Sequence, residues 1–122
     1  MAKTIVIVDD SASMRQVVSI ALKNSGYDVI ECVDGKDALE KLDGKKVHLI
    51  VSDVNMPNMD GIALLQELKK DASYKFTPII MLTTESGDDK KAAGRTAGAK
   101  AWMVKPFQPE ELLMAVSKLV LP

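Results

Sequence analysis

The chain has 122 residues, with 16 Lys and Arg against 17 Asp and Glu and a formal net charge of -1. Its length suits one compact domain, and a content of 47% hydrophobic and 27% charged residues is typical of a globular protein. Aromatic residues make up 4% of the chain and no basic stripe occurs, which disfavours nucleic-acid binding. No apolar run approaches the roughly 20 residues of a membrane span and no signal peptide is evident. We therefore expect a cytoplasmic monomer without membrane contact.

Five short apolar segments alternate with longer segments of helical pattern. They are residues 4–8, 29–33, 48–51, 78–82 and 101–104. Their hydrophobicity is continuous rather than alternating, which indicates strands buried on both faces of a parallel sheet. Right-handed crossovers between such strands give an open, doubly wound α/β sheet with helices on both faces, and such sheets bind ligands beyond the carboxyl ends of the strands. We expect one domain over residues 1–122, with no second domain attached.

The first predicted helix carries an apolar stripe at helical spacing, formed by Met14, Val17, Val18 and Ala21. We predict that this stripe faces the sheet, and Gly26 is a stop signal after the helix. Ser11 and Ser13 are available as N-caps. The single Cys32 lies in the second predicted strand and cannot form an intramolecular disulfide, so we interpret it as a core residue.

The second, third and last predicted helices also have apolar faces. Asp34 is a good N-cap for the second helix, and Pro109 suits the first turn of the last. The apolar positions are Ala38, Leu39 and Leu42 in the second helix, Ile62, Leu65 and Leu68 in the third, and Leu112, Leu113, Val116, Leu119 and Val120 in the last. The segment before the last strand, residues 88–97, has only alanines on its apolar face and contains Gly94. We expect this fourth helix to be weakly anchored and able to move.

Polar side chains that could bind a metal or take part in catalysis follow four of the five strands. They are Asp9 and Asp10 after the first strand, Asp53 after the third, Thr83 and Thr84 after the fourth, and Lys105 after the fifth. An isolated Asp at a strand end is usually a helix cap. Because the carboxyl ends of parallel strands share one edge, we expect these residues to converge. Three carboxylates in one place repel, so they either stay partly protonated or recruit a cation, and oxygen ligands alone favour Mg²⁺.

This set of residues suits phosphoryl chemistry. Lys105 can neutralise a carboxylate or phosphoryl oxygen, and the Thr83 hydroxyl can donate a hydrogen bond to the same oxygen. An Asp carboxylate can attack phosphorus and form an aspartyl-phosphate. Phosphoryl transfer needs mainly positioning and charge neutralisation, so no separate base is required.

Four motifs in this chain together resemble the bacterial response-regulator receiver domain, of the stand-alone chemotaxis type. They are Ile7-Val8-Asp9-Asp10-Ser11, Asp53-Val54-Asn55-Met56-Pro57-Asn58-Met59-Asp60-Gly61, Leu82-Thr83-Thr84 and Val104-Lys105-Pro106-Phe107. The match spans essentially the whole chain, and the motifs occur in the order and spacing of that family. The resemblance implies a flavodoxin-like five-stranded sheet with strand order 2-1-3-4-5.

The resemblance also assigns roles to individual residues. It implies that Asp53 is the phosphoacceptor and that Lys105 and Thr83 contact the phosphoryl group. The implied metal site consists of Asp9, Asp10, Asp53 and the backbone carbonyl of Asn55, with Asp10 the direct ligand. Thr83 and Trp102 are the implied switch pair, since an inward turn of the hydroxyl vacates space for the aromatic ring. Asn55 and Glu85 are implied to flank the attacking water and to tune dephosphorylation.

The function that the resemblance implies is that of a response regulator in a two-component phosphorelay. A histidine kinase would phosphorylate it, and the phosphorylated form would bind an output partner such as the flagellar motor switch, with a phosphatase as a further partner. It would catalyse only its own phosphorylation and dephosphorylation. A phosphorelay shuttle or phosphate sink remains an alternative. An aspartate-nucleophile phosphohydrolase is less favoured because that motif has a second acid where this chain has Asn55, and a flavin carrier lacks a phosphate-binding loop and ring-sandwiching aromatics.

Overall fold

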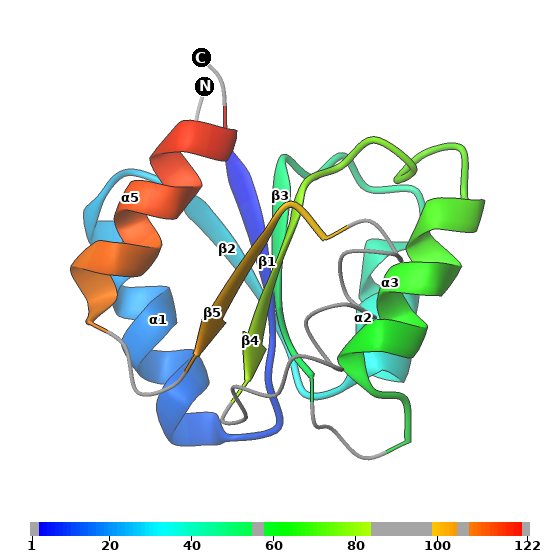
Figure 1. Cartoon of the computed structure of the whole chain (residues 1–122), viewed down its shortest axis with the longest axis horizontal. Coiled ribbons are helices and arrows are strands. Elements are labelled where there is room, and N and C mark those ends of the chain that lie inside the picture. Colours follow the sequence, from blue (N-terminus) through cyan, green and yellow to red (C-terminus); the bar gives the residue numbers. More distant parts are fainter. Residues whose placement is uncertain (1–2, 55–57, 84–98, 105–107, 121–122) are drawn as a thin grey trace.

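The computed structural model describes residues 3–54, 58–83, 99–104 and 108–120. Five parallel strands form one sheet in the order β2-β1-β3-β4-β5, as the resemblance implied (Figure 1). The strands are β1 (Thr4–Val8), β2 (Asp28–Cys32), β3 (Leu49–Asp53), β4 (Ile79–Thr83) and β5 (Ala101–Val104). The doubly wound α/β prediction is therefore confirmed.

The bounds of the three middle strands differ from the prediction by one or two residues. The third strand was expected to end at Val51, yet its ladder continues through Ser52 and Asp53, which pair with Met81 and Leu82 of β4. Backbone pairing with a neighbour on each side extends a central strand past its last apolar residue. Asp53 and Thr83 are thus the last residues of their strands rather than the first residues after them.

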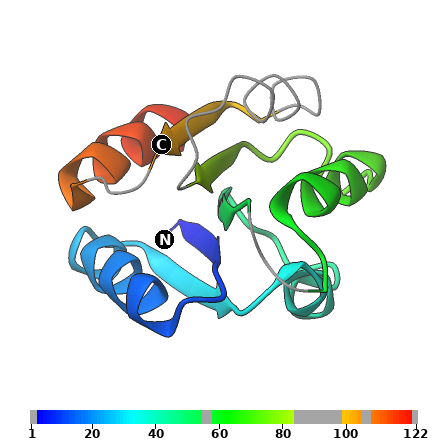
Figure 2. The same cartoon turned by 60° about the horizontal axis from the view of Figure 1, so that its bottom comes forward.

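The described helices pack in two layers, one on each face of the sheet. They are α1 (Ala12–Asn24), α2 (Gly35–Leu42), α3 (Gly61–Lys70) and α5 (Pro109–Leu119). Helices α1 and α5 cover one face, and α2 and α3 cover the other (Figures 1 and 2). The predicted fourth helix, residues 88–97, lies outside the described residues. No helix in the described part of the chain is both long and apolar enough to span a bilayer.

The continuous apolar runs divide between two cores because successive side chains of a strand point to opposite faces. Ile5 and Ile7 of β1 join the core beneath α1 and α5, whereas Val6 and Val8 join the core beneath α2 and α3. Cys32 belongs to the core beneath α2 and α3 and is fully buried. Burial raises the pKa of its thiol to about 11, so it is a core residue, as predicted.

Side-chain caps begin three of the helices. The Ser11 hydroxyl accepts a hydrogen bond from the Met14 N–H at the start of α1, and Asp60 accepts one from the Ala63 N–H at the start of α3. Asp34 accepts one from the Asp37 N–H at the start of α2. The predicted caps Ser11 and Asp34 are therefore confirmed, and each helix that they begin follows directly from a strand end.

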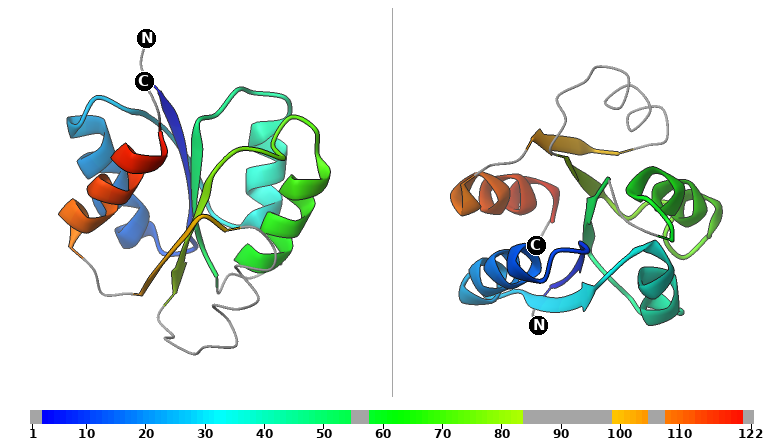
Figure 3. Two further views of the ribbon diagram at one scale, coloured as in Figure 1. Left: turned by 45° about the horizontal axis from the view of Figure 1, so that its top comes forward. Right: turned by 90° about the horizontal axis from the view of Figure 1, so that it is seen from below.

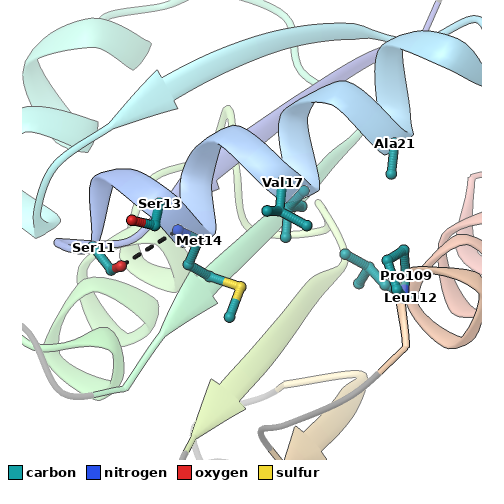
Figure 4. Close-up of a pocket in the computed structure, with 8 residues that line it drawn as sticks. Ser11, Ser13, Met14, Val17, Ala21, Pro109 and Leu112 are labelled. Atoms are coloured by element: carbon teal, nitrogen blue, oxygen red, sulfur yellow. Dashed lines mark hydrogen bonds between the residues drawn. The ribbon is translucent and has the colours of Figure 1, made fainter.

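The predicted orientation of α1 was wrong for Val17, which is 52% exposed. Among the residues that α1 buries are Val18 and Leu22, which lie four positions apart on the same face of the helix. Val17 does not lie on this buried face. Val17 instead lines a groove of about 250 Å³ between α1 and α5, together with Ala21, Pro109 and other residues (Figure 4).

Candidate functional site

Three acidic residues meet at the carboxyl edge of the sheet. Asp9 follows β1 directly and is fully buried, Asp10 is exposed, and Asp53 ends β3 and is 7% exposed. Strands β1 and β3 are neighbours, and Val8 pairs with Ser52, so the two strands end side by side. One oxygen from each carboxylate lies within 4.8 Å of the other two. The predicted convergence of Asp9, Asp10 and Asp53 is therefore present, at the lower end of the sheet in Figure 1.

The turn from β1 into α1 holds Asp9 in place. Its N–H donates to the Cys32 carbonyl at 3.1 Å, continuing the ladder to β2. One of its carboxylate oxygens accepts a hydrogen bond from the Ser11 N–H at 2.8 Å, and the Arg15 guanidinium donates to its carbonyl oxygen at 2.6 Å. Because its backbone and side chain are both bonded, Asp9 is a fixed part of the cluster, while Asp10 next to it faces solvent.

Close backbone packing holds Asp53 in place at the end of β3. The Val54 N–H donates to the Leu82 carbonyl and the Gly61 N–H donates to the Val54 carbonyl, both at 2.9 Å. A Cβ atom on Gly61 would collide with the Asp53 carbonyl oxygen and would lie 2.6 Å from the Met81 methyl group. A glycine is required there because α3 begins against the strand end that carries Asp53.

The carboxylate cluster fits a small, hard divalent cation. Carboxylates are the donors that Mg²⁺ prefers, and it keeps several waters beside one or two protein carboxylates. Three carboxylate oxygens within 4.8 Å of one another are close enough for one such ion to contact all three, directly or through its bound waters. Three carboxylates gathered in one place repel one another, and a divalent cation lowers that repulsion.

The other predicted site residues are only partly described. Thr83 ends β4, next to β3, although its side chain lies outside the described residues. Trp102 lies in β5, is half-buried and packs against the core beneath α2 and α3. Its indole N–H is buried and has no hydrogen-bond partner in the described part of the chain. Asn55, Glu85 and Lys105 lie outside the described residues, so their expected roles are not tested.

Sequence reasoning did not single out several residues that support the cluster. Arg15 contacts the Asp9 carbonyl, and Asn58 bonds to Asp34 in the turn after β2. Because Gly61 has no side chain, the start of α3 can lie against the Asp53 carbonyl oxygen. A glycine at a helix start and an Asn in a short loop are local signals of close approach and of a left-handed backbone, yet neither indicates which distant residue is the partner.

The chain was compared with known proteins and structures. Residues 5–117 match the family described as the response regulator receiver domain. Protein PilG of Pseudomonas aeruginosa is 38% identical over 112 residues, which cover 92% of this chain and 83% of PilG. Chemotaxis protein CheY1 of Helicobacter pylori is 39% identical over 110 residues, covering 88% and 89% of the two chains. The structure of Vibrio cholerae chemotaxis protein CheY4 superposes with a TM-score of 0.93 at 44% identity, covering 98% of this chain and 99% of that one. Figure 3 shows the fold of this chain from two further sides. The chain belongs to the response regulator receiver domain family.

Proposed function

We propose that this chain is a phosphoryl-accepting switch in which Asp53 takes a phosphoryl group from a histidine kinase with the help of Mg²⁺. The observation that carries the proposal is the meeting of the Asp9, Asp10 and Asp53 carboxylates within 4.8 Å at the carboxyl edge of the sheet. In open α/β folds this edge is where ligands bind. Membership of the receiver family supports phosphoryl transfer, rather than metal binding alone, as the function of this cluster.

In the proposed reaction, a carboxylate oxygen of Asp53 attacks the phosphorus of the kinase phosphohistidine. The oxygen–phosphorus bond forms as the nitrogen–phosphorus bond breaks, and the imidazole nitrogen keeps the electron pair and takes up a proton. A Mg²⁺ ion, when bound, would supply positive charge that stabilises the transferred phosphoryl group. Asp9 and Asp10 would hold that ion with Asp53 and the Asn55 carbonyl, while Lys105 and Thr83 contact the phosphoryl oxygens. Hydrolysis returns Asp53 to a carboxylate, with Asn55 and Glu85 beside the attacking water.

The switch would couple this chemistry to partner binding through Thr83 and Trp102. The two residues lie on neighbouring strands, and Trp102 already packs partly into the core. We expect the indole ring to fill the space that an inward turn of the Thr83 hydroxyl vacates.

We assign the output to chemotaxis in the cytoplasm, with a flagellar motor switch as the partner of the phosphorylated form. CheY1 and CheY4, two of the relatives described above, are chemotaxis proteins by name. The chain would catalyse only its own phosphorylation and dephosphorylation.

The proposal is tested by incubating the purified protein with acetyl phosphate, with and without Mg²⁺. We expect at most one phosphoryl group per chain, formed only with Mg²⁺ and counted by intact-protein mass spectrometry. We also expect no sustained hydrolysis of p-nitrophenyl phosphate under the same conditions. Repeated turnover of that ester would instead indicate a phosphohydrolase, and uptake without any divalent ion would contradict the role of the acidic cluster.

A further inference from the structure

The segment from the end of β2 to the start of α2 contacts the loop that carries Asp9 and Asp10 and also the loop that follows Asp53. On one side the Cys32 carbonyl accepts a hydrogen bond from the Asp9 N–H at 3.1 Å. On the other side the Gly35 N–H donates to the Met59 carbonyl at 3.3 Å. This segment therefore connects the loop of Asp9 and Asp10 to the loop that follows Asp53 through backbone hydrogen bonds.

Asp34 lies in this segment, and its two carboxylate oxygens accept different hydrogen bonds. One oxygen accepts a hydrogen bond from the Asp37 N–H at 2.8 Å and so caps α2. The other accepts a hydrogen bond from the Asn58 side-chain amide, also at 2.8 Å. The residue is 8% exposed. The two bonds, that from the Asp37 N–H first, hold the pKa of Asp34 below its ordinary value of 3.8, so the carboxylate is ionised at neutral pH.

Asn58 is held in a conformation that needs outside support. Its φ of 66° lies in the left-handed region, which Asn tolerates better than most residues but still at a cost. The bond to Asp34 links this residue to α2 across 24 positions of sequence. Gly35 allows the approach, since a Cβ there would lie 2.9 Å from the Met59 carbonyl oxygen.

The loop after Asp53 is thus fixed at both of its described ends. Val54 is bonded to Leu82 and to Gly61, and Asn58 and Met59 are bonded to Asp34 and Gly35. Only residues 55–57 separate the two fixed positions. Anything that releases Asn58 therefore loosens the backbone that leads directly from the end of β3.

We propose that Asp34 is a positioning residue of the metal site. Through Asn58 it holds the loop after Asp53 at the spacing from Asp9 and Asp10 that Mg²⁺ binding requires. The inference rests on the proposed function, because it assigns a task in the same site. Residues that orient metal ligands without touching the ion commonly change metal affinity about 10- to 100-fold when they are replaced.

Exchanging donor and acceptor separates this role from helix capping. Asn58→Asp leaves the Asp34 cap on α2 in place but sets a carboxylate where the amide donated, so the bond between the two side chains is lost. The double variant Asp34→Asn/Asn58→Asp restores both bonds, because the amide introduced at position 34 would donate to the carboxylate introduced at position 58 while its oxygen still caps α2. The double variant also keeps the net charge. Asn24→Asp, at the exposed end of α1, adds the same charge away from the cluster and is the matched control.

The measurement is the Mg²⁺ dissociation constant, obtained from amide shifts of Asp10 and Asp53 in two-dimensional NMR. We expect Asn58→Asp to raise the constant about 10-fold, Asn24→Asp to leave it within about 2-fold of wild type, and the double variant to recover most of the loss. An Asn58→Asp constant equal to that of Asn24→Asp would overturn the inference. A weakened constant that the double variant does not recover would also overturn it, because a loss of stability would then explain the effect.

Failure of the proposed function gives a different result. Asp10→Asn removes a carboxylate from the cluster and should weaken Mg²⁺ binding strongly whatever Asp34 does. If wild type shows no Mg²⁺-dependent shifts at Asp10 and Asp53, both the proposed metal site and the proposed role of Asp34 are contradicted. If Asp10→Asn weakens binding and Asn58→Asp does not, only the role of Asp34 is lost.

Discussion

Asp53→Asn is expected to reduce phosphoryl uptake from acetyl phosphate by at least about 1,000-fold, which is the scale on which loss of a nucleophile acts. The amide has nearly the shape of the carboxylate but lacks the charged oxygen that attacks phosphorus. Asp53 ends a fully buried strand and its backbone is bonded to neighbours, so the fold should survive the exchange. Intact-protein mass spectrometry after incubation with acetyl phosphate and Mg²⁺ measures the phosphorylated fraction.

Asp71→Asn is the matched control, because it neutralises an exposed carboxylate at the end of α3, outside the cluster. Its uptake should equal that of wild type. Equal labelling of Asp53→Asn and wild type would place the phosphoryl group on another residue and remove Asp53 from the reaction.

Gly61→Ala is expected to lower the free energy of unfolding by about 2 kcal/mol. The new methyl group would collide with the Asp53 carbonyl oxygen and the Met81 side chain, and such overpacking costs about 1 to 3 kcal/mol, occasionally more. The better helix propensity of Ala offsets at most about 1 kcal/mol of this. The collision involves backbone at the end of β3, so relief requires movement of the strand end or of α3. Urea denaturation followed by circular dichroism measures the change.

Gln66→Ala is the control for Gly61→Ala, since it alters an exposed position of the same helix. We expect it to stay within about 0.5 kcal/mol of wild type. A Gly61→Ala variant as stable as Gln66→Ala would show that the contact between α3 and the end of β3 is loose, and that Asp53 is not fixed by close packing.

The sheet was predictable because central parallel strands must be apolar on both faces. The run Ile5-Val6-Ile7-Val8 divides between two cores as that rule requires. The convergence of Asp9, Asp10 and Asp53 was predictable for a related reason, since the ends of adjacent parallel strands meet at one edge. Strand order itself came from the resemblance, because hydrophobic pattern alone does not determine which strands are neighbours.

Features set by tertiary contact were predicted less well. The end of β3 was missed because Ser52 and Asp53 are polar, although their backbones pair with β4. The predicted face of α1 was wrong at Val17, although Met14 and Val18 pack in the core beneath α1 and α5 as expected, and the fully buried Leu22 was left out of the stripe. The bond between Asp34 and Asn58 joins two loops 24 residues apart. It was not predicted because each residue is explained locally, Asp34 as the cap of α2 and Asn58 by its left-handed backbone.

The position of a bound metal ion tests the role of the acidic cluster most directly. Crystals grown near neutral pH with Mn²⁺ in place of Mg²⁺ would locate the ion by its anomalous scattering. We expect one ion about 2.1 Å from a carboxylate oxygen of Asp53, with Asp10 or Asp9 as a second protein ligand. A cluster without an ion at saturating Mn²⁺, or an ion bound only elsewhere on the surface, would contradict metal-assisted phosphorylation at Asp53.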